Sequence, residues 1–513
     1  MSRGIKVVEV SDNPQVAFVS ISELSVAAPG PLSRQGTVTI EILPDDALVE
    51  IFSFYLEEAY ESWETHEIER MDAWYTLVHV CRRWRNVVFA SSRRLNLRLL
   101  YTNRRPVPKT LNHPPTLPIV IWQKESDGRS PPQVEAWGTD NIISALGRRD
   151  CVSRIYLMNL PLLPLDKFTE MTQESFPALT HLELESKDYG ESALVLQDTF
   201  LGGSAPRLRL LRLHNIRFPS IHKLLLSASD VVDLHLLMIP HSGYISPEAM
   251  VNCLSSLTRL EDFRLGFQAP GSSPPRPTRP PPLTRVDLPS LARLWFSGNS
   301  LYLEDFAAWI NAPSLYILEM VFLNCIYFDV LQLTEFIDRV DRFKVLDQAE
   351  VFFYDKLVRV TLSSQKGSVD RTTLMVVNEC RPSYFRFLFL AKVRNSLLYL
   401  LSSLERLDIS EDRDWLPHLH DDVDNAHWLK LLHPFTGVKD LHIFGLPGLY
   451  IARALQDLTE ARIVEVLPAL QNVFLEGPSG AMAQAIRPFI ARRQVSGHPV
   501  SVRSRERVKG ADD

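Results

Sequence analysis

Apolar residues from about position 150 onward recur in a repeated unit of one apolar residue, two spacers, a second apolar residue, one spacer and a third. Eleven units fit this pattern, and their starts lie 23 to 34 residues apart except across one gap of 64 residues. Because side chains alternate along a strand, the second and third apolar residues lie on one face of it. The pattern predicts a series of short strands that share one core. The units begin at Val152, Leu179, Leu208, Val231, Leu260, Leu291, Leu315, Val340, Leu404, Val438 and Leu470.

Helix signals occur between the predicted strands. Ser246, Pro247 and Glu248 suit the N-cap and the first two positions of a helix that we expect over 249–257. An alternation of short strands and helices predicts an α/β fold. Further helices are expected over 304–310, 334–340, 426–432 and 450–466.

The repeated unit resembles the LxxLxL core of leucine-rich repeats, whose period is roughly 20 to 29 residues. The resemblance implies an irregular leucine-rich-repeat-like α/β solenoid, with a concave strand surface that binds a protein target. Two alternatives stay open: a chance match in a leucine-rich chain, and a conventional α/β domain. The gap of 64 residues holds either an insertion or degenerate units, one of them at Leu357, Val360 and Leu362.

Two helical segments precede the repeated units. In the first, Pro44 suits a first helical position, and Asp45 and Asp46 place negative charge where the helix dipole favours it. Both segments carry an apolar stripe at helical spacing, which by itself is also typical of an ordinary helical hairpin in a core. The stripes consist of Leu48, Ile51 and Phe52 in the first segment and of Leu77, Val80, Cys81 and Trp84 in the second.

The two segments resemble the F-box, a three-helix module, because they combine a leucine–proline start, an Ile-Phe pair and a Val-Cys-Arg-x-Trp motif. The resemblance covers roughly residues 40 to 95 and extends to a large class of fungal F-box-like proteins. In the F-box family this module docks on the Skp-type adaptor of cullin-RING ubiquitin ligases. The adaptor-binding set that the resemblance implies, facing the adaptor or forming the core of the module, is Leu43, Pro44, Leu48, Ile51, Phe52, Val80, Cys81 and Trp84.

The chain departs from the F-box pattern in two places. Phe52 and Val80 are 28 residues apart, which is longer than is usual in the family. The additional segment 57–70 carries six glutamates, and we expect it to form an exposed acidic insertion. The Leu-Trp pair that ends the family pattern is replaced by Leu95 and Asn96.

These patterns divide the chain into regions. Alternating apolar residues from Leu95 to Tyr101 predict a strand directly after the F-box, and residues 117–122 predict a buried one. Segment 270–282 is rich in proline and is expected to be a loop within the array. The predicted regions are a flexible leader at 1–38, an F-box-like domain at 39–94, a leucine-rich-repeat-like array at 95–495 and a basic flexible tail at 496–513.

Composition narrows the functional classes. The 513 residues carry a net charge of −6, which argues against general binding of nucleic acid, a partner that requires a basic surface. The 5 cysteines lie far apart and indicate reduced thiols. Because no stretch has the pattern of a signal peptide or a membrane span, we expect a cytoplasmic and/or nuclear protein without a membrane partner.

Catalytic and cofactor motifs are absent from the sequence, which contains no GxxxxGK[ST], HExxH or GxSxG pattern and no GxGxxG after a strand. One polar segment, from His418 to His427, offers metal-type ligands, but nothing in the sequence shows that they converge. We therefore expect no cofactor, no metal and no catalytic residues.

The expected function is that of a substrate-recognition subunit of a Skp–cullin–F-box type ubiquitin ligase. It would bind the Skp-type adaptor and, through it, cullin, while the array binds an unknown protein substrate. One alternative is a non-ligase interaction scaffold whose F-box is a structural cap or binds the adaptor alone. A second alternative is an enzyme with a dispersed site within residues 150–495.

Overall fold

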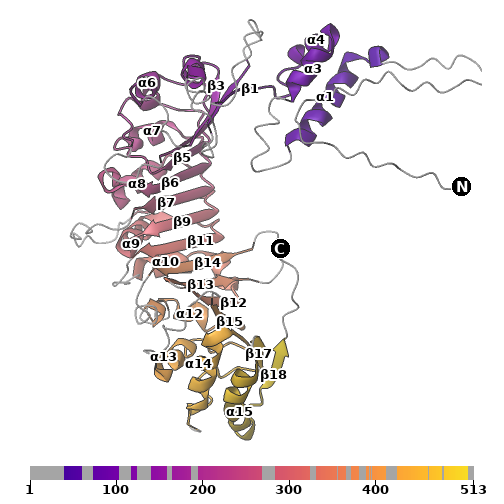
Figure 1. Ribbon diagram of the computed structural model, residues 1–513. Coiled ribbons are helices and arrows are strands. Elements are labelled where there is room, and N and C mark those ends of the chain that lie inside the picture. Colours follow the sequence, from indigo (N-terminus) through magenta and orange to yellow (C-terminus); the bar gives the residue numbers. More distant parts are fainter. Residues whose placement is uncertain are drawn as a thin grey trace, which may run out of the picture.

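The computed structural model of this chain combines a small N-terminal helical unit with one long curved sheet (Figure 1). The predicted leader 1–38, the proline-rich segment 270–282 and most of the acidic segment 57–70 lie outside the described residues. The structure describes residues 40–60, 73–102, 117–123, 140–158, 165–186, 194–268, 284–323, 331–354, 356–364, 371–379, 389–391, 393, 396–411, 424–459, 462–476 and 479–505.

The described residues of the helical unit form three α-helices after a short 3-10 turn, and Figure 1 shows the unit set apart from most of the sheet. The first helix begins one residue later than predicted, since Pro44, expected at its first position, directly precedes it. Asp45 and Asp46 lie in its first turn, as the sequence predicts. Leu56, Trp74 and other apolar residues form its core. Its elements are η1 (Ile40–Ile42), α1 (Asp45–Tyr60), α3 (Trp74–Val80) and α4 (Arg82–Ala90).

The main sheet has sixteen strands in the order β1-β2-β3-β4-β5-β6-β7-β9-β11-β14-β13-β12-β15-β16-β17-β18. Neighbouring strands are parallel except on both sides of β13. A separate parallel pair joins β8 (Val286–Asp287) to β10 (Ile310–Asn311). The strands of the main sheet are β1 (Leu99–Thr102), β2 (Ile119–Gln123), β3 (Val152–Leu157), β4 (His181–Glu185), β5 (Leu210–His214), β6 (Asp233–Ile239), β7 (Asp262–Phe267), β9 (Arg293–Gly298), β11 (Ile317–Leu323), β12 (Gln348–Phe353), β13 (Leu357–Ser363), β14 (Thr373–Glu379), β15 (Arg406–Glu411), β16 (Asp440–Phe444), β17 (Asn472–Glu476) and β18 (Ser501–Arg505).

The sheet curves into an arc, with its strands on the inner side and the helices on the outer side (Figure 1). Parallel strands require a crossover on one face, and here the helices provide it. Among the described residues, no helix covers the inner face. The outer elements are α6 (Leu165–Met171), η3 (Phe200–Gly203), α7 (Ile221–Ser227), η4 (His241–Gly243), α8 (Pro247–Leu254), α9 (Ser300–Trp309), α10 (Leu331–Asp338), η5 (Asp341–Val345), α12 (Leu398–Leu401), α13 (Asn425–Leu432), α14 (Gly445–Gln456) and α15 (Ser479–Val495).

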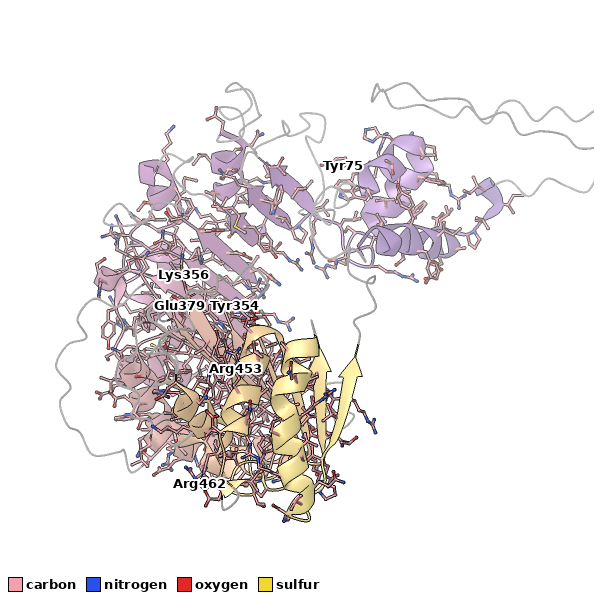
Figure 2. All side chains as sticks on the ribbon, turned by 60° about the horizontal axis from the view of Figure 1, so that its bottom comes forward. Tyr75, Tyr354, Lys356, Glu379, Arg453 and Arg462 are labelled. Carbon is pink, nitrogen blue, oxygen red and sulfur yellow. The ribbon has the colours of Figure 1, made fainter. Side chains whose placement is uncertain are left out.

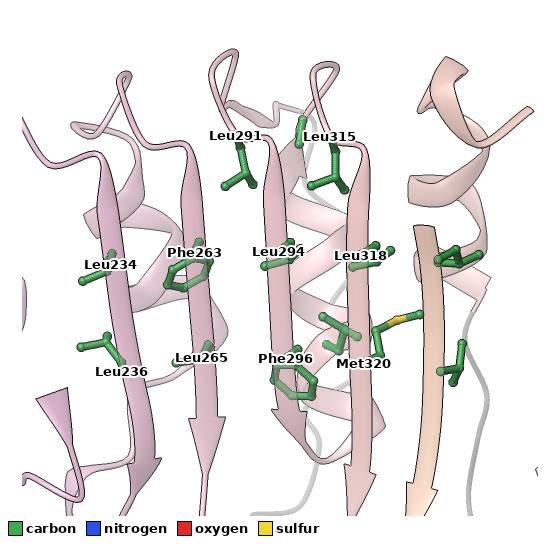
Figure 3. Packing of buried hydrophobic residues seen from close by; sticks show 14 of the residues in the cluster. Leu234, Leu236, Phe263, Leu265, Leu291, Leu294, Phe296, Leu315, Leu318 and Met320 are labelled. Carbon is green, nitrogen blue, oxygen red and sulfur yellow. The ribbon is translucent and has the colours of Figure 1, made fainter. Parts of the chain in front are cut away.

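The repeated apolar unit builds the core between strands and helices. In ten of the eleven predicted units all three apolar residues are buried. Figure 3 shows the arrangement: Leu291 and Leu315 lie in the turns before their strands, and Leu294 and Leu318 follow on the strands in register. Each strand thus adds the same layer of side chains to one continuous core, as the pattern predicts.

The unit that begins at Val340 is a wrong prediction. Residues 341–345 form the turn η5, and Val345 is 61 % exposed. The strand of this unit is β12, where Ala349 and Val351 are buried. Leu346, Ala349 and Val351 keep the correct spacing, but alanine is too small to mark a core position in a pattern of large apolar residues.

The gap of 64 residues holds β12, β13 and β14, which run as an antiparallel meander. Leu357, Val360 and Leu362 do lie on a strand, but β13 runs against its neighbours, so their prediction as a repeat unit is wrong. The Tyr354 N–H donates to the Leu357 carbonyl at 2.9 Å in the tight turn that joins β12 to β13. Such a turn is too short for the crossover that a parallel strand needs. Tyr354, Lys356 and Glu379 mark this end of the meander in Figure 2.

The predicted helices exist, with shifted ends. The Ser246 hydroxyl accepts a hydrogen bond from the Ala249 N–H at 3.2 Å and caps α8, which confirms this N-cap. Helix α14 ends at Gln456, ten residues before the predicted end at 466. Arg492 from α15 donates to the carbonyls of Gln456 and Leu458, so a distant side chain completes the end of this helix.

The prediction of a flexible tail from residue 496 is corrected by β18. The Ser501 N–H donates to the Gln471 carbonyl at 2.8 Å, and Val502 pairs with Val473 of β17. Strand β17 would otherwise present a row of unpaired backbone groups, and the chain after α15 satisfies them. Residues 506–513 lie outside the described residues.

Gly437 marks the close approach of two stacked turns. A Cβ atom at this position would lie 2.5 Å from the Ser402 carbonyl oxygen and 2.9 Å from that of Leu404. We expect Gly437→Ala to destabilise the chain by about 1–3 kcal/mol, because backbone atoms cannot yield as a flexible side chain does. Urea unfolding measures this. Gly480→Ala is the control: a Cβ there meets nothing within 4 Å, so a loss of stability in both variants would contradict the steric explanation.

Candidate functional site

Helix α1 separates a buried apolar face from an exposed one. Leu48 and Phe52 lie in the core of the helical unit and are almost fully buried. Ile51, Phe54 and Tyr55 lie at i, i+3 and i+4 on a second stripe and are exposed. Large apolar side chains that cluster at a surface indicate contact with another molecule.

Tyr55 joins the exposed stripe of α1 to α3. Its hydroxyl oxygen lies 3.2 Å from Thr76 Oγ1. Val80 lies one turn further along α3 and is 58 % exposed. Ile40 and Ile42, just before α1, are exposed as well. The surface that we call the apolar patch consists of Ile51, Phe54, Tyr55 and Val80.

Arg83 holds the start of α1 against α4. Its Nη2 donates to the Leu43 carbonyl at 2.5 Å and to Asp45 Oδ1 at 2.7 Å. At the start of α4, Cys81 Sγ accepts from the Trp84 N–H at 3.4 Å and serves as the N-cap. These contacts position the leucine–proline segment at the surface of the unit.

The structure divides the eight residues of the predicted adaptor-binding set. Leu48 and Phe52 have no surface to offer to a partner, so their prediction as adaptor contacts is corrected to a role in the core. Their spacing of four residues puts both on the inner stripe of α1, where Phe52 packs on the Trp84 ring at 4.7 Å. Leu43 and Trp84 are half-buried, and the exposed members are Pro44, Ile51, Val80 and Cys81.

The inner face of the sheet is the second candidate surface, and it is strongly charged along part of its length. Because the strands are in register, side chains of successive strands form rows across this face. One row runs from β4 to β9 and contains, in order, Glu183, Arg212, His235, Arg264 and Trp295. Opposite charges are therefore neighbours in this part of the face.

Asp262 is the centre of an ion-pair network on this face. Its side chain is only 4 % exposed. Arg293 Nε donates to Asp262 Oδ2 at 2.8 Å, and Arg264 Nε donates to Asp262 Oδ1 at 3.2 Å. One strand away, Arg212 makes a two-pronged contact with Asp233 at 3.1 and 3.0 Å. His235 Nε2 lies between the two carboxylates, 3.3 Å from Asp233 and 3.4 Å from Asp262.

The electrostatics of this network favour the ionised form of the Asp262 carboxylate, which pairs with arginine. Burial alone would raise the pKa of Asp262, but His235, Arg264 and Arg293 outweigh it and hold this pKa well below its usual range. Asp233, His235 and Asp262 do bring three metal-type ligand atoms within 4.8 Å of one another. Since guanidinium groups already occupy both carboxylates, we interpret the cluster as a neutralised ion-pair network.

Most of the polar segment from His418 to His427 lies outside the described residues. Asp424 and His427 have a structural role at the start of α13. Asp424 Oδ1 accepts from the His427 N–H at 3.1 Å and lies 2.6 Å from His427 Nδ1. Asp424 is thus the N-cap of this helix, and these contacts lower the pKa of its carboxyl group.

Comparison with known proteins gives no assignment. No family model matches the chain, and no curated protein matches it. Among the described residues, no helix has both the length and the apolar character needed to cross a membrane.

Sequence reasoning missed two features of these surfaces. The first is the contact of Arg83 with the start of α1. Arg83 is one of two arginines between Cys81 and Trp84, and its place inside this motif was the only hint in the sequence. The network around Asp262 left no local motif, because its residues come from four strands, β5, β6, β7 and β9, that lie far apart in the sequence. An arginine and an aspartate at strand positions are ordinary surface residues until register brings them together.

Proposed function

We propose that this chain is a substrate-recognition subunit of a Skp–cullin–F-box type ubiquitin ligase. The helical unit is the F-box and contacts the Skp-type adaptor. The sheet and its helices form an irregular leucine-rich-repeat solenoid that holds a protein target on its inner face. The observation that carries the proposal is the coincidence of the F-box sequence positions Pro44, Ile51 and Val80 with exposed apolar side chains on a small helical unit.

The proposed mechanism is proximity. Apolar contacts at the apolar patch and at Pro44 supply the affinity for the adaptor, with charged residues at the rim. The adaptor brings cullin and a conjugating enzyme, and the array brings the target. A lysine of the target then meets activated ubiquitin at high effective concentration, so the chain itself needs no catalytic group.

Two features of the array support the solenoid part of the proposal. One strand is added per unit, and the apolar layers repeat in register along the sheet. In the part of the chain that the structure describes, the helices lie on the outer side of the sheet, and a partner can reach the inner face of the strands (Figure 1). Repeat arrays bind their partners on surfaces of this kind.

Val80→Glu tests the adaptor contact. We expect wild type to co-purify in a one-to-one complex with a co-expressed Skp-type adaptor. The variant should bind at least about 30-fold more weakly, because it places a charge in a desolvated apolar contact. Calorimetry with the purified adaptor measures the difference. A Leu43→Ala/Pro44→Ala double variant probes the leucine–proline segment in the same way.

Val345→Glu is the matched control, because Val345 is also an exposed valine and lies on η5 of the array. It should bind the adaptor as wild type does. The proposed ligase function would be contradicted if folded wild type formed no complex with the adaptor. It would also be contradicted if both variants lost adaptor binding equally.

One observation favours a structural cap instead. Trp74 Nε1 donates to the Arg98 carbonyl at 2.9 Å, and the buried Leu95 and Leu97 lead from α4 into β1. The helical unit is therefore attached to the segment that enters the first strand of the array, as the cap of a non-ligase scaffold would be. Purification of the chain from cells separates the two functions. Recovery of cullin together with the adaptor supports the ligase subunit, whereas a purely structural cap binds neither protein and needs no exposed patch.

A further inference from the structure

The inner face is not uniform, and its end next to the helical unit combines arginine with aromatic residues. Register places Arg154 of β3 opposite His181 of β4. Tyr156, two residues after Arg154 on β3, lies opposite Trp122 of β2. These side chains are half-buried. Arginine, tryptophan and tyrosine are the residue types that contribute most of the energy in protein interfaces.

Several arginines lie close enough to His181 to act on it electrostatically. Its Nδ1 lies 2.8 Å from Thr180 Oγ1. Burial, together with the fields of Arg154, Arg98, Arg209 and Arg212, lowers the pKa of the His181 imidazole to about 4. The imidazole is therefore neutral at pH 7, and the positive charge around it comes from the arginines. We call Arg98, Arg154, Arg209 and His181 the basic corner.

Nearby carboxylates do not neutralise two arginines of the basic corner, Arg154 and Arg209. Glu183, next along β4, lies 3.8 Å from Arg212, which also holds Asp233. Among the residues that the structure describes, Arg154 and Arg209 make no ion pair. Arg209 directly precedes β5 and is exposed. Arg154 and Arg209 can therefore accept carboxylates from outside the chain.

We propose that the basic corner and the Trp122–Tyr156 pair bind a short acidic segment of a partner protein, one with glutamate or aspartate side chains beside an apolar anchor. The arginines pair with the carboxylates, and the aromatic rings pack against the anchor. The inference rests on the proposed function in one respect, that the inner face binds a protein target.

Charge along the face distinguishes such a segment from nucleic acid. Beyond the basic corner, Glu183, Glu185 and Asp233 lie on the same face. A nucleic-acid backbone carries a charge at every step and would meet these carboxylates as it continued along the strands. A short peptide places its charges at the corner alone, so the face favours a peptide.

Fluorescence anisotropy of the purified full chain, without adaptor, tests this directly. The probe is a short fluorescein-labelled peptide of glutamates with two phenylalanines. We expect saturable binding that weakens as salt is raised, because exposed charges are screened. The Arg154→Glu/Arg209→Glu variant should bind at least tenfold more weakly. A peptide with glutamine in place of glutamate should lose affinity to a similar extent.

Arg487→Glu is the matched control, since Arg487 is an exposed arginine on α15. It should bind the probe as wild type does, and thermal unfolding of all variants should coincide. Equal binding of the glutamine peptide, or equal loss in the Arg487 variant, would overturn the proposal. Binding that requires phosphoserine, or binding of an oligonucleotide in preference to the peptide, would also overturn it. Because no adaptor is present, failure here is distinct from failure of the ligase function.

Discussion

Asp262→Asn is expected to destabilise the sheet by about 3 kcal/mol. The substitution keeps the shape of the side chain but removes the charge that Arg264 and Arg293 share. Both guanidinium groups are 44 % exposed, so water takes over part of their solvation, and the loss falls at the lower end of the range for a broken buried pair. Urea unfolding of the two proteins measures it.

The effect should depend on pH with a definite sign. The pKa of Asp262 is lower in the folded chain than in the unfolded one, so its ionisation stabilises the fold above the unfolded value, about 3.9. This stabilisation is lost as pH falls through the folded pKa. The difference between wild type and Asp262→Asn should therefore be constant near neutral pH and shrink in acid. A difference that grows in acid would show that the network does not hold Asp262 ionised.

Asp230→Asn provides the control for the network. Asp230 pairs with Arg259 at 3.2 Å, but both side chains are about half exposed. Exposed pairs contribute about 0–1 kcal/mol. If this variant lost as much stability as Asp262→Asn, burial of the network would not be the reason for its contribution.

Trp74→Ala is expected to destabilise the helical unit by about 3–5 kcal/mol. Trp74 is fully buried, its ring lies 6.0 Å from that of Phe89, and its Nε1 donates to the Arg98 carbonyl. The substitution removes both the packing and the link to β1. Since most of the sheet does not contact the unit, we expect amide exchange to accelerate over residues 45–60 and 74–90, with the strands from β3 onward unchanged.

Trp74→Phe is the comparison for this prediction. Phenylalanine keeps most of the buried ring but removes the hydrogen bond to Arg98, so only about 1 kcal/mol or somewhat more should be lost. Under the proposed function, Trp74→Ala also abolishes adaptor binding, because the apolar patch needs α1 and α3 in place. A Trp74→Ala variant with unchanged exchange would contradict the role of this residue as the centre of the unit.

The repeated strands could be predicted from the sequence because their large buried apolar residues recur at a fixed spacing within a short stretch of chain. Leu291, Leu294 and Phe296 show the pattern in one short stretch, and their neighbours in register repeat it. The pattern failed where its physical basis changed. At β12 a small residue, Ala349, takes a core position, and at β13 an apolar strand runs in the opposite direction. The spacing of apolar residues indicates that a segment forms a strand, but it does not indicate in which direction that strand runs.

The candidate surfaces were only partly predictable. Helical spacing and the resemblance to the F-box pointed to the segment around Ile51 and Val80, but the same stripe contains Leu48, and only packing shows which members face solvent. The ion-pair network and the basic corner left no signal. Arg154 and His181 are 27 residues apart in the chain and become neighbours only when β3 pairs with β4.

The sequence by itself determined where most strands and helices form and which side chains build most of the core, because these follow from local propensity and from the period of apolar residues. The tertiary structure alone decided the direction of β13, the strand β18 that follows the last helix, and the end of α14 at an arginine from α15. It also decided which charges meet on the inner face. Those outcomes depend on contacts between distant segments, which strand pairing creates and no local pattern records.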